Sequence, residues 1–414
     1  MEGRHFCGAC ALWPSIASLR SNSHVRREQA ARVARGSQEA VLITMAEGAL
    51  FPGRKVIVDN VYDSFADAVG NTPLIKLTKA SAETGCTIYG KMEFLNPGGS
   101  VKDRAALYLI EDAERRGLLK PGGIIVEGTA GNTGIGLALI ARCKGYRTII
   151  VIPNTQSEEK KQMLRIAGAE LVEVPAVPYR NPNNYARLAG RLAEQMGAFW
   201  ANQFDNPVNR LAHIETTGPE IWQQTGGKLD AFSCAIGTGG TLSGCASYLR
   251  SQKPDITIGL TDPAGAALVH YYNHGELKGE GSSISEGIGQ GRVTKAIGED
   301  FKPDVALTIS DSEGMEWALQ LLEEEGLCVG ISSGINVAGA VHLARQLGPG
   351  HTLVTILCDL GTRYSAKLFN PVFLSSKKLP SPTWLESTEV SPEVTEALER
   401  ATAGEDEVQV AMQK

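Results

Sequence analysis

The central part of the chain alternates short apolar runs with segments of helical period. From about Tyr62 to Asn370, β-branched runs come directly before amphipathic or small-residue segments that favour helix. The clearest pairs are IIVEG before GIGLALIARCKG, TIIVIP before SEEKKQMLRIAG, DAFSCAIG before TLSGCASYLRSQ, and VALTISD before EGMEWALQLLEEEG; AELVEV, ITIGLTDP and HTLVTILCD are further predicted strands. This alternation is typical of repeated βαβ units, and continuous apolar runs indicate strands buried on both faces. We therefore predict an α/β protein with mostly parallel sheets.

The two ends of the chain differ from this pattern. Residues 1–44 hold six Arg, no Lys and three Glu, which is the Arg-rich, acid-poor composition of a mitochondrial transit peptide. Glu28 and Glu39 dilute that composition, so a disordered extension or a start at Met45 explains the segment equally well. We expect a mitochondrial location, otherwise a cytoplasmic one. Residues 371–414 are predicted to form a tail with a short helix at about Ser391 to Arg400.

Composition excludes several classes of protein. With 414 residues, 43% of them hydrophobic, the chain can bury a large core, which argues against disorder throughout. The formal charge of −6, with no long basic run beyond the N-terminal segment, argues against a nucleic-acid partner. No apolar run reaches the ~18 residues of a membrane span. The 46 glycines favour tight turns and ligand loops.

Several polar residues are predicted to have no role in chemistry. Most of the eight cysteines lie in apolar runs and are interpreted as small hydrophobes, and the Cys7-Cys10 pair has no second pair to complete a metal site. His270 and His274 could share a helix face but have no third ligand, so we expect both to be exposed.

Two further polar groups are given structural interpretations. Asp262 and Pro263 are predicted to mark a turn or helix start. Residues 158–161 (Glu-Glu-Lys-Lys) are predicted to form a solvated helix face.

The first candidate for chemistry is the glycine-rich turn 96–104, NPGGSVKDR, which leads into a predicted helix. It places Lys102 in the first helical turn, where the positive end of the helix dipole disfavours a protonated amine and favours a nucleophilic one. Taken alone, a lysine at such a position is more often a solvated surface residue.

Three further small-residue turns follow or join predicted elements. The turn 129–134, TAGNTG, lies between a strand and a helix, where free N–H groups suit a carboxylate. The turn 237–241, GTGGT, has the same setting and three glycines, which suits a phosphate, although it completes neither a P-loop nor GxGxxG. The turn 330–334, GISSG, is interpreted by itself as a serine helix cap.

Together these motifs resemble the fold-type II pyridoxal-phosphate enzymes, specifically the cysteine synthase (O-acetylserine sulfhydrylase) family. The resemblance runs from about Val61 to Asn370. It rests on GNTPLIKL, NPGGSVKDR, EGTAGNTGIGLAL, QFDNPVNRLAHIETTGPEIW, GTGGTLSG, EGIGQGR and GISSGI.

The resemblance implies a role for each matching residue. Lys102 would form a Schiff base with pyridoxal 5'-phosphate, Asn132 would touch the cofactor 3-hydroxyl, and Ser332 would bond the pyridine nitrogen. The phosphate would be held by Gly237, Thr238, Gly239, Gly240 and Thr241. The substrate carboxylate would fall to Thr129, Asn132, Thr133 and Gln203, with Gly287 bordering the site.

The resemblance also implies a tryptophan synthase β-like architecture of two α/β domains with the cofactor in the cleft between them. The larger domain would combine 46–95 with 207–370, the smaller mobile domain would cover 96–206, and 1–45 and 371–414 would be extensions. Members of the family are usually homodimers. Whether an acetyltransferase partner binds, such as a serine acetyltransferase, is not readable from the sequence.

The function implied is replacement of the acetoxy group of O-acetyl-L-serine by sulfide, giving L-cysteine and acetate. A β-cyanoalanine synthase acting on cysteine and cyanide remains an alternative. So does condensation like that of cystathionine β-synthase, although the tail is too short for the regulatory module of that family and no heme-binding arrangement is recognisable. A catalytically silent sensor is disfavoured by the intact Lys102, and dehydratases of this fold have a different asparagine-loop motif.

Three departures from the family pattern change these expectations. Ala130 replaces a serine and removes one hydroxyl from the carboxylate site, which should alter affinity without abolishing activity. Leu360 stands where relatives typically show serine, which changes the polarity expected near the cofactor ring. The N-terminal extension has no counterpart in the compact enzymes.

Overall fold

Two sheets form the framework of the computed structural model, which describes residues 61–386 and 390–402. The first sheet has the order β1-β2-β10-β7-β8-β9, and only the β1-β2 pair is antiparallel. Its strands are β1 (Leu74–Lys76), β2 (Thr87–Met92), β7 (Ala231–Cys234), β8 (Thr257–Pro263), β9 (Val305–Ile309) and β10 (Thr352–Leu357).

The second sheet is wholly parallel, with the order β5-β4-β3-β6. Its strands are β3 (Ile124–Gly128), β4 (Arg147–Pro153), β5 (Glu170–Val174) and β6 (Phe199–Trp200). This sheet is therefore built from chain that lies between β2 and β7 of the first sheet. Both sheets belong to one unit, which begins at Ser64.

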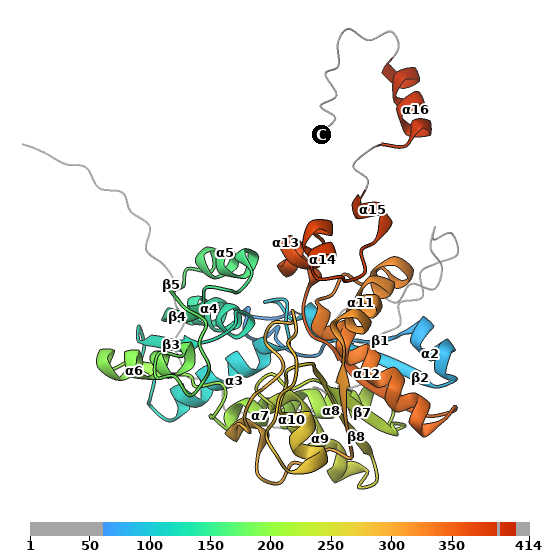
Figure 1. Cartoon of the computed structure of the whole chain (residues 1–414). Helices are drawn as coiled ribbons and strands as arrows, with labels where there is room; N and C mark the ends of the chain where they lie inside the picture. The colour runs from blue at the N-terminus through green and yellow to red at the C-terminus, as the bar shows by residue number, and fades with distance from the viewer. Residues whose placement is uncertain (1–60, 387–389, 403–414) are drawn as a thin grey trace, which may run out of the picture. The chain divides into compact units, whose positions relative to one another are not determined.

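Helices cover both sheets, as Figure 1 shows for α4 to α6 around β3 and β4. The longer helices are α3 (Lys102–Arg115), α4 (Asn132–Lys144), α5 (Glu158–Ile166), α6 (Tyr185–Met196), α9 (Gly240–Gln252), α11 (Asp311–Glu325), α12 (Ile331–Leu347) and α16 (Pro392–Thr402). The shorter ones are α2 (Thr78–Thr84), α7 (Val208–Ala212), α8 (Gly218–Gln224), α10 (Leu268–His274), α13 (Ser365–Leu368), α14 (Pro371–Ser376) and α15 (Thr383–Glu386).

This arrangement confirms the predicted α/β class with mostly parallel sheets. Every strand and helix named from the pattern is present, and α16 confirms the helix predicted in the tail. The N-terminal segment 1–45 and the Cys7-Cys10 pair lie outside the described residues. In the part that is described, no helix is long and apolar enough to cross a membrane.

The continuous apolar runs of the central strands are explained by burial on both faces of the sheet, as predicted. In β4, Ile150 and Ile152 pack with residues of α4 and α5, whereas Ile149 and Val151 pack with α6 on the other face. The first sheet is likewise covered on both faces. The prediction of burial on both faces is wrong for β5 and β9, because each is an edge strand with several exposed or half-buried positions.

Three of the polar interpretations need correction. Asp262 and Pro263 do not mark a turn or helix start: they are the last residues of β8 and pair with β9. The helix face at 158–161 is not fully solvated, because the side chains of Lys160 and Lys161 are 1% and 3% exposed. His274 is exposed as predicted, but His270 is half-buried.

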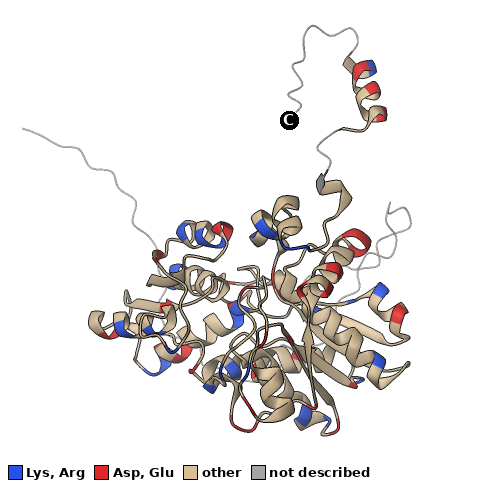
Figure 2. Cartoon of the chain, viewed as in Figure 1, with Lys and Arg blue, Asp and Glu red and all other residues tan. Residues whose placement is uncertain are grey.

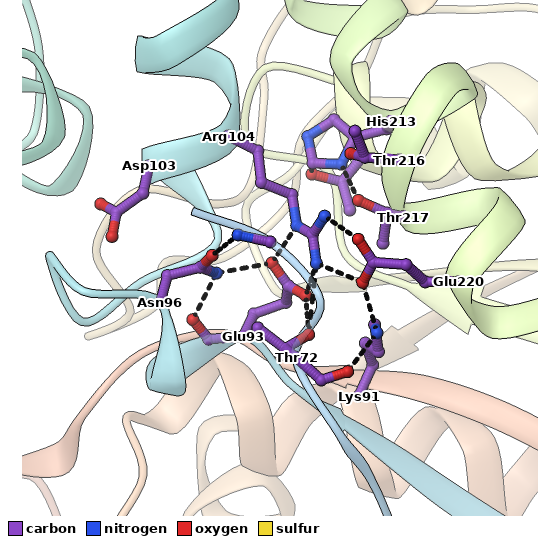
Figure 3. Close-up of polar contacts among 12 residues, drawn as sticks. Thr72, Lys91, Glu93, Asn96, Asp103, Arg104, His213, Thr216, Thr217 and Glu220 are labelled. Carbon is purple, nitrogen blue, oxygen red and sulfur yellow. Dashed lines mark hydrogen bonds and ion pairs between the residues drawn. The ribbon is translucent and has the colours of Figure 1, made fainter. Parts of the chain in front are cut away.

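Many of the charged residues are spread along the helices, as Figure 2 shows. A separate network of buried charges joins α3 to β2 and α8. Arg104 donates to Glu93 at 2.7 Å and to Glu220 at 2.6 Å, and Lys91 donates to Glu220 at 2.6 Å (Figure 3). Burial alone would raise the pKa of Glu93, but the adjacent Arg104 charge lowers it to about 2. Glu93 is therefore ionised, and its charge is balanced by Arg104.

Removal of the central cation should destabilise the fold. We expect Arg104→Met to lower the free energy of unfolding by about 3–5 kcal/mol, because it leaves the fully buried Glu93 carboxylate and the partly buried Glu220 without that partner. Urea unfolding measures the change. Arg345→Met is the control, since Arg345 is exposed in its pair with Glu83 and should cost less than about 1 kcal/mol. Equal losses in the two variants would contradict this account.

Candidate functional site

A cavity of about 680 Å³ opens near the carboxyl ends of β3, β7 and β10. The predicted site residues that line it are Lys102, Thr129, Asn132, Thr133, Gln203, Gly237, Thr238, Gly287 and Ser332. A smaller adjoining cavity shares Lys102, Gly237 and Thr238 with the first and is also lined by Gly239 and Thr241. Gly240 lines neither cavity. The structure therefore brings together residues that are spread over 230 positions of sequence, from Lys102 to Ser332.

Lys102 is the first residue of α3, as predicted. The turn before it is fixed by two hydrogen bonds: the Gly98 N–H donates to Asp103 Oδ2 at 2.6 Å, and the Val101 N–H donates to the Cys358 carbonyl at 2.9 Å. A Cβ at Gly237 would lie 3.8 Å from Lys102 Nζ. The amine therefore lies beside the 237–241 turn.

The 237–241 turn forms an anion cradle at the start of α9. The N-cap residue Gly239 provides no side-chain cap, and the Gly240 N–H makes only a long hydrogen bond of 3.4 Å to Thr238 Oγ1, so the next N–H groups of the first turn remain available to a ligand. A Cβ at Gly237 would lie 2.3 Å from the Gly287 carbonyl oxygen, so a side chain at this position would clash. A Cβ at Gly287 would meet no atom within 4 Å, which agrees with its place on the cavity wall.

A buried histidine supports the cradle from behind. His213 Nε2 lies 3.2 Å from Thr241 Oγ1, and its Nδ1 lies 2.9 Å from Thr217 Oγ1. Burial lowers the pKa of His213 to about 3, so the imidazole is neutral. A neutral ring that accepts from Thr217 can donate Nε2–H to Thr241, which leaves the Thr241 hydroxyl proton for an anion.

The 129–134 turn precedes α4 and supplies a second set of donors. The Gly131 N–H donates to Thr129 Oγ1 at 3.1 Å, so the Thr129 hydroxyl proton is not used there. Thr133 Oγ1 donates to Gln203 Oε1 at 2.5 Å, and Gln203 Nε2 donates to the Gly128 carbonyl at 3.0 Å. The Thr133 hydroxyl is therefore used by Gln203, whose amide is bonded in turn to Gly128. The start of α4 has no side-chain cap.

Asn209 joins Gln203 to the 237–241 turn. Its Nδ2 donates to the Gln203 carbonyl at 2.8 Å and to Thr238 Oγ1 at 2.9 Å. Sequence reasoning missed Asn209 and His213, although both lie in the quoted segment QFDNPVNRLAHIETTGPEIW. Their position in a family motif was the signal that could have found them.

Ser332 lies in the first turn of α12, and the N-cap of that helix is Gly330. The interpretation of the 330–334 turn as a serine cap is therefore wrong. Ser332 is 5% exposed and shares the cavity wall with Cys358. Burial raises the pKa of the Cys358 thiol to about 11, so this wall carries no charge from either side chain. Leu360 packs against the apolar cluster around α12 and does not line the cavity.

A second lysine reaches the cavity. Lys160 Nζ donates to Glu286 at 2.8 Å, and Lys367 donates to the other Glu286 oxygen at 2.5 Å. Burial lowers the pKa of Lys160, while the Glu286 carboxylate opposes that shift. The sequence pattern gave no signal for this pair, because the two residues are 126 positions apart.

Glu127 is a buried carboxyl beneath the 129–134 turn. Burial raises its pKa to about 8, an effect that hydrogen bonds from Gln203 and from the backbone of Asn202 only partly offset. Its Oε2 has no hydrogen-bond partner. At neutral pH this group is therefore mostly protonated.

The donors fit the cofactor that the motifs predict. A phosphate would fit the 237–241 turn, because α9 begins there without a side-chain cap and the turn borders both cavities. An amine lies beside the cradle at Lys102, and a neutral serine and an asparagine amide face the same cavity. No cluster of His, Cys, Asp and Glu suited to a metal ion occurs among residues 61–386 and 390–402.

Comparison with known proteins gives consistent matches. Residues 65–359 match the family described as pyridoxal-phosphate dependent enzymes. The chain is 55% identical over 317 residues to cysteine synthase 1 of Neurospora crassa, covering 75% of this chain and 84% of that protein. It is 53% identical over 341 residues to cysteine synthase 1 of Emericella nidulans, covering 80% and 91%. The solved O-acetylserine dependent cystathionine beta-synthase of Helicobacter pylori gives a TM-score of 0.69 at 36% identity, covering 74% and 98%.

The raised pKa of Glu127 predicts a pH dependence of stability. A carboxyl with a pKa near 4.5 in the unfolded chain and about 8 in the folded chain stabilises the fold fully below pH 4.5. That contribution is lost as the pH rises through about 8. Glu127→Gln has no such ionisation, so we expect its melting temperature to fall less than that of the wild type between about pH 5 and about pH 8.5. Each kcal/mol of stability that the wild type loses should lower its melting temperature by roughly 2–4 °C.

Thermal unfolding at several pH values measures this difference. Glu170→Gln is the matched control, since Glu170 is exposed at the start of β5. If Glu127→Gln and the wild type had parallel melting profiles, Glu127 would not be the buried titrating group.

Proposed function

We propose that this chain, which belongs to the family of pyridoxal-phosphate dependent enzymes and within it to the cysteine synthases, makes L-cysteine and acetate from O-acetyl-L-serine and sulfide. The membership confirms the family that the motifs indicated. The observation that carries the proposal is a pair of adjoining cavities lined by Lys102, by the anion cradle at α9 and by the carboxylate-type turn at α4.

Within this proposal the chain's residues would hold pyridoxal 5'-phosphate. Lys102 would carry it covalently, the 237–241 cradle would bind its phosphate, Ser332 would bond its ring nitrogen, and Asn132 would contact its 3-hydroxyl. When bound, the cofactor supplies an electron sink for negative charge at the substrate α-carbon. Ser332 is a neutral partner for the ring, which favours elimination and replacement over transamination.

The remaining steps would belong to the residues around the amino acid. Donors from Thr129, Gln203 and the start of α4 would bind the α-carboxylate and orient the Cα–H bond. Once the substrate amine has replaced the Lys102 amine in the covalent link, the freed Nζ would take the α-proton as the Cβ–O bond breaks and acetate leaves. Sulfide would then form the Cβ–S bond, and Lys102 would return the proton to the α-carbon. The sum is one acetate released for each sulfide consumed.

Closure of a smaller domain would protect this reaction. We propose the domains as 46–95 with 207–370 and 96–206, because 96–206 contains all four strands of the second sheet. Binding of a carboxylate at the 129–134 turn would draw this domain over the cavity and exclude water. A homodimer and a mitochondrial location belong to the same proposal.

The Schiff-base assignment predicts the site of a covalent label. We expect borohydride reduction followed by peptide mapping to find the pyridoxyl group on Lys102, and Lys102→Ala to abolish turnover and the visible absorption of the bound cofactor. The label is not expected on Lys160, the other lysine of the cavity, because Glu286 holds its amine. Lys79→Ala is the control, because Lys79 is a partly exposed lysine paired with Glu324. A label on Lys160, or full turnover by Lys102→Ala, would overturn the assignment.

The assignment of sulfide as the nucleophile predicts how the rates with different substrate pairs rank. We expect O-acetylserine with sulfide to give a higher kcat/KM than cysteine with cyanide or serine with homocysteine. O-Acetylserine with homocysteine is a necessary fourth pair, since a solved relative is named for an O-acetylserine dependent cystathionine synthesis. Initial rates with the same enzyme preparation decide among them. A higher kcat/KM for either homocysteine pair would replace the proposed reaction.

A further inference from the structure

Two charged side chains from the segment after β10 hold the amide of Asn132. Asn132 Nδ2 donates to Asp359 Oδ2 at 2.7 Å, and Arg363 Nη1 donates to Asn132 Oδ1 at 2.6 Å. Asp359 is 0% exposed and Arg363 is 9% exposed. The amide thus lies between a buried anion and a mostly buried cation, 227 and 231 positions away in sequence.

This pair is itself fixed by its surroundings. Tyr364 Oη donates to Asp359 Oδ2 at 2.6 Å, and Ser157 Oγ donates to the Arg363 carbonyl at 2.9 Å. Arg363 Nη2 donates to the Gly98 carbonyl. A Cβ at Gly99 would lie 2.7 Å from that same Nη2, so the close approach of the guanidinium depends on a glycine there.

The charges select one of the two orientations of the amide. With its nitrogen toward Asp359 and its oxygen toward Arg363, the amide donates to the anion and accepts from the cation. The opposite orientation would place the amide oxygen against a carboxylate and the amide N–H against a guanidinium. The second Nδ2 hydrogen has no partner in the part of the chain described, and Asn132 lines the cavity.

We propose that Asp359 and Arg363 are positioning residues that hold Asn132 so that its remaining N–H donates to the 3-hydroxyl oxygen of the cofactor. The inference rests on the proposed function, because it needs a cofactor at Asn132. Neither residue touches that group directly; each acts through the orientation of one amide.

Arg363 has a second part in the same arrangement. Its guanidinium donates both to the Gly98 carbonyl and to Asn132 Oδ1. It therefore fixes the turn that precedes Lys102 relative to the turn that carries Asn132. A lysine would keep the charge but has no planar fork to bond both acceptors in this geometry. Arg363→Lys therefore tests the fork separately from the charge.

The test is a double-mutant cycle on cofactor affinity. The wild type, Arg363→Lys, Asn132→Ala and the double variant are compared by equilibrium dialysis of the full-length holoenzyme, with retained pyridoxal phosphate followed by its visible absorption. We expect Arg363→Lys to weaken affinity about tenfold in the wild type. In the Asn132→Ala background the same change should weaken it less than about threefold, because the amide is already gone.

Asp359→Asn provides a second variant with little change in size. It removes the anion that selects the amide orientation, so it should also weaken cofactor binding strongly with Asn132 present and weakly without it. Arg345→Lys is the matched control, because Arg345 is exposed on α12, and it should leave affinity unchanged. Melting temperatures of the cofactor-free variants report any purely structural loss.

The outcomes separate the inference from the proposed function. Coupled losses of affinity in both cycles support the positioning role. Losses of affinity that add in the double variant, or that follow the melting temperatures, overturn the positioning role. In that case, cofactor binding by the wild type still upholds the proposed function. Failure of the wild type to bind pyridoxal phosphate would overturn both.

Discussion

Free backbone N–H groups at the starts of α4 and α9 are the constraint on which the site depends. The two helices follow β3 and β7, which belong to different sheets, and both begin beside the same cavity. Each of these two helices begins without a side-chain cap and borders the cavity. Their donors suit anions, and the Lys102 amine lines the same cavity. A ligand with a phosphate and a carboxylate nearby satisfies all three.

Buried charges hold the elements that carry these groups. Arg104, two residues after Lys102, is neutralised by Glu93 and Glu220 from other segments. Asp359 and Arg363 each bond the amide of Asn132, one from either side. Buried ion pairs are weak sources of stability, because desolvation offsets their attraction, but they penalise any arrangement that leaves a charge unpaired. Their use around the cavity therefore favours one geometry of its walls.

The residues that sequence reasoning found and those that it missed differ in a physical way. The residues that were found, Lys102, Asn132 and the 237–241 cradle, each lie in a short turn at the start of a helix. The turn itself positions the amine or the N–H donors, so a short sequence motif is enough to identify them. Lys160 was interpreted as solvated because charge pairing on a helix looks the same whether or not another segment covers it. Its partner, Glu286, comes from a distant loop, and no periodicity in α5 indicates that contact.

By itself the sequence determined the α/β class, the strand and helix order, and the turns that bear the amine and the anion donors, because these follow from local periodicity and from glycine and cap positions. Tertiary structure alone decided the division into two sheets, the edge positions of β5 and β9, the burial of Asp262 and Lys160, and the contacts of Asn209, Asp359 and Arg363. These depend on which distant segments meet, and a hydrogen bond across some 230 residues leaves no trace in the pattern of either segment alone.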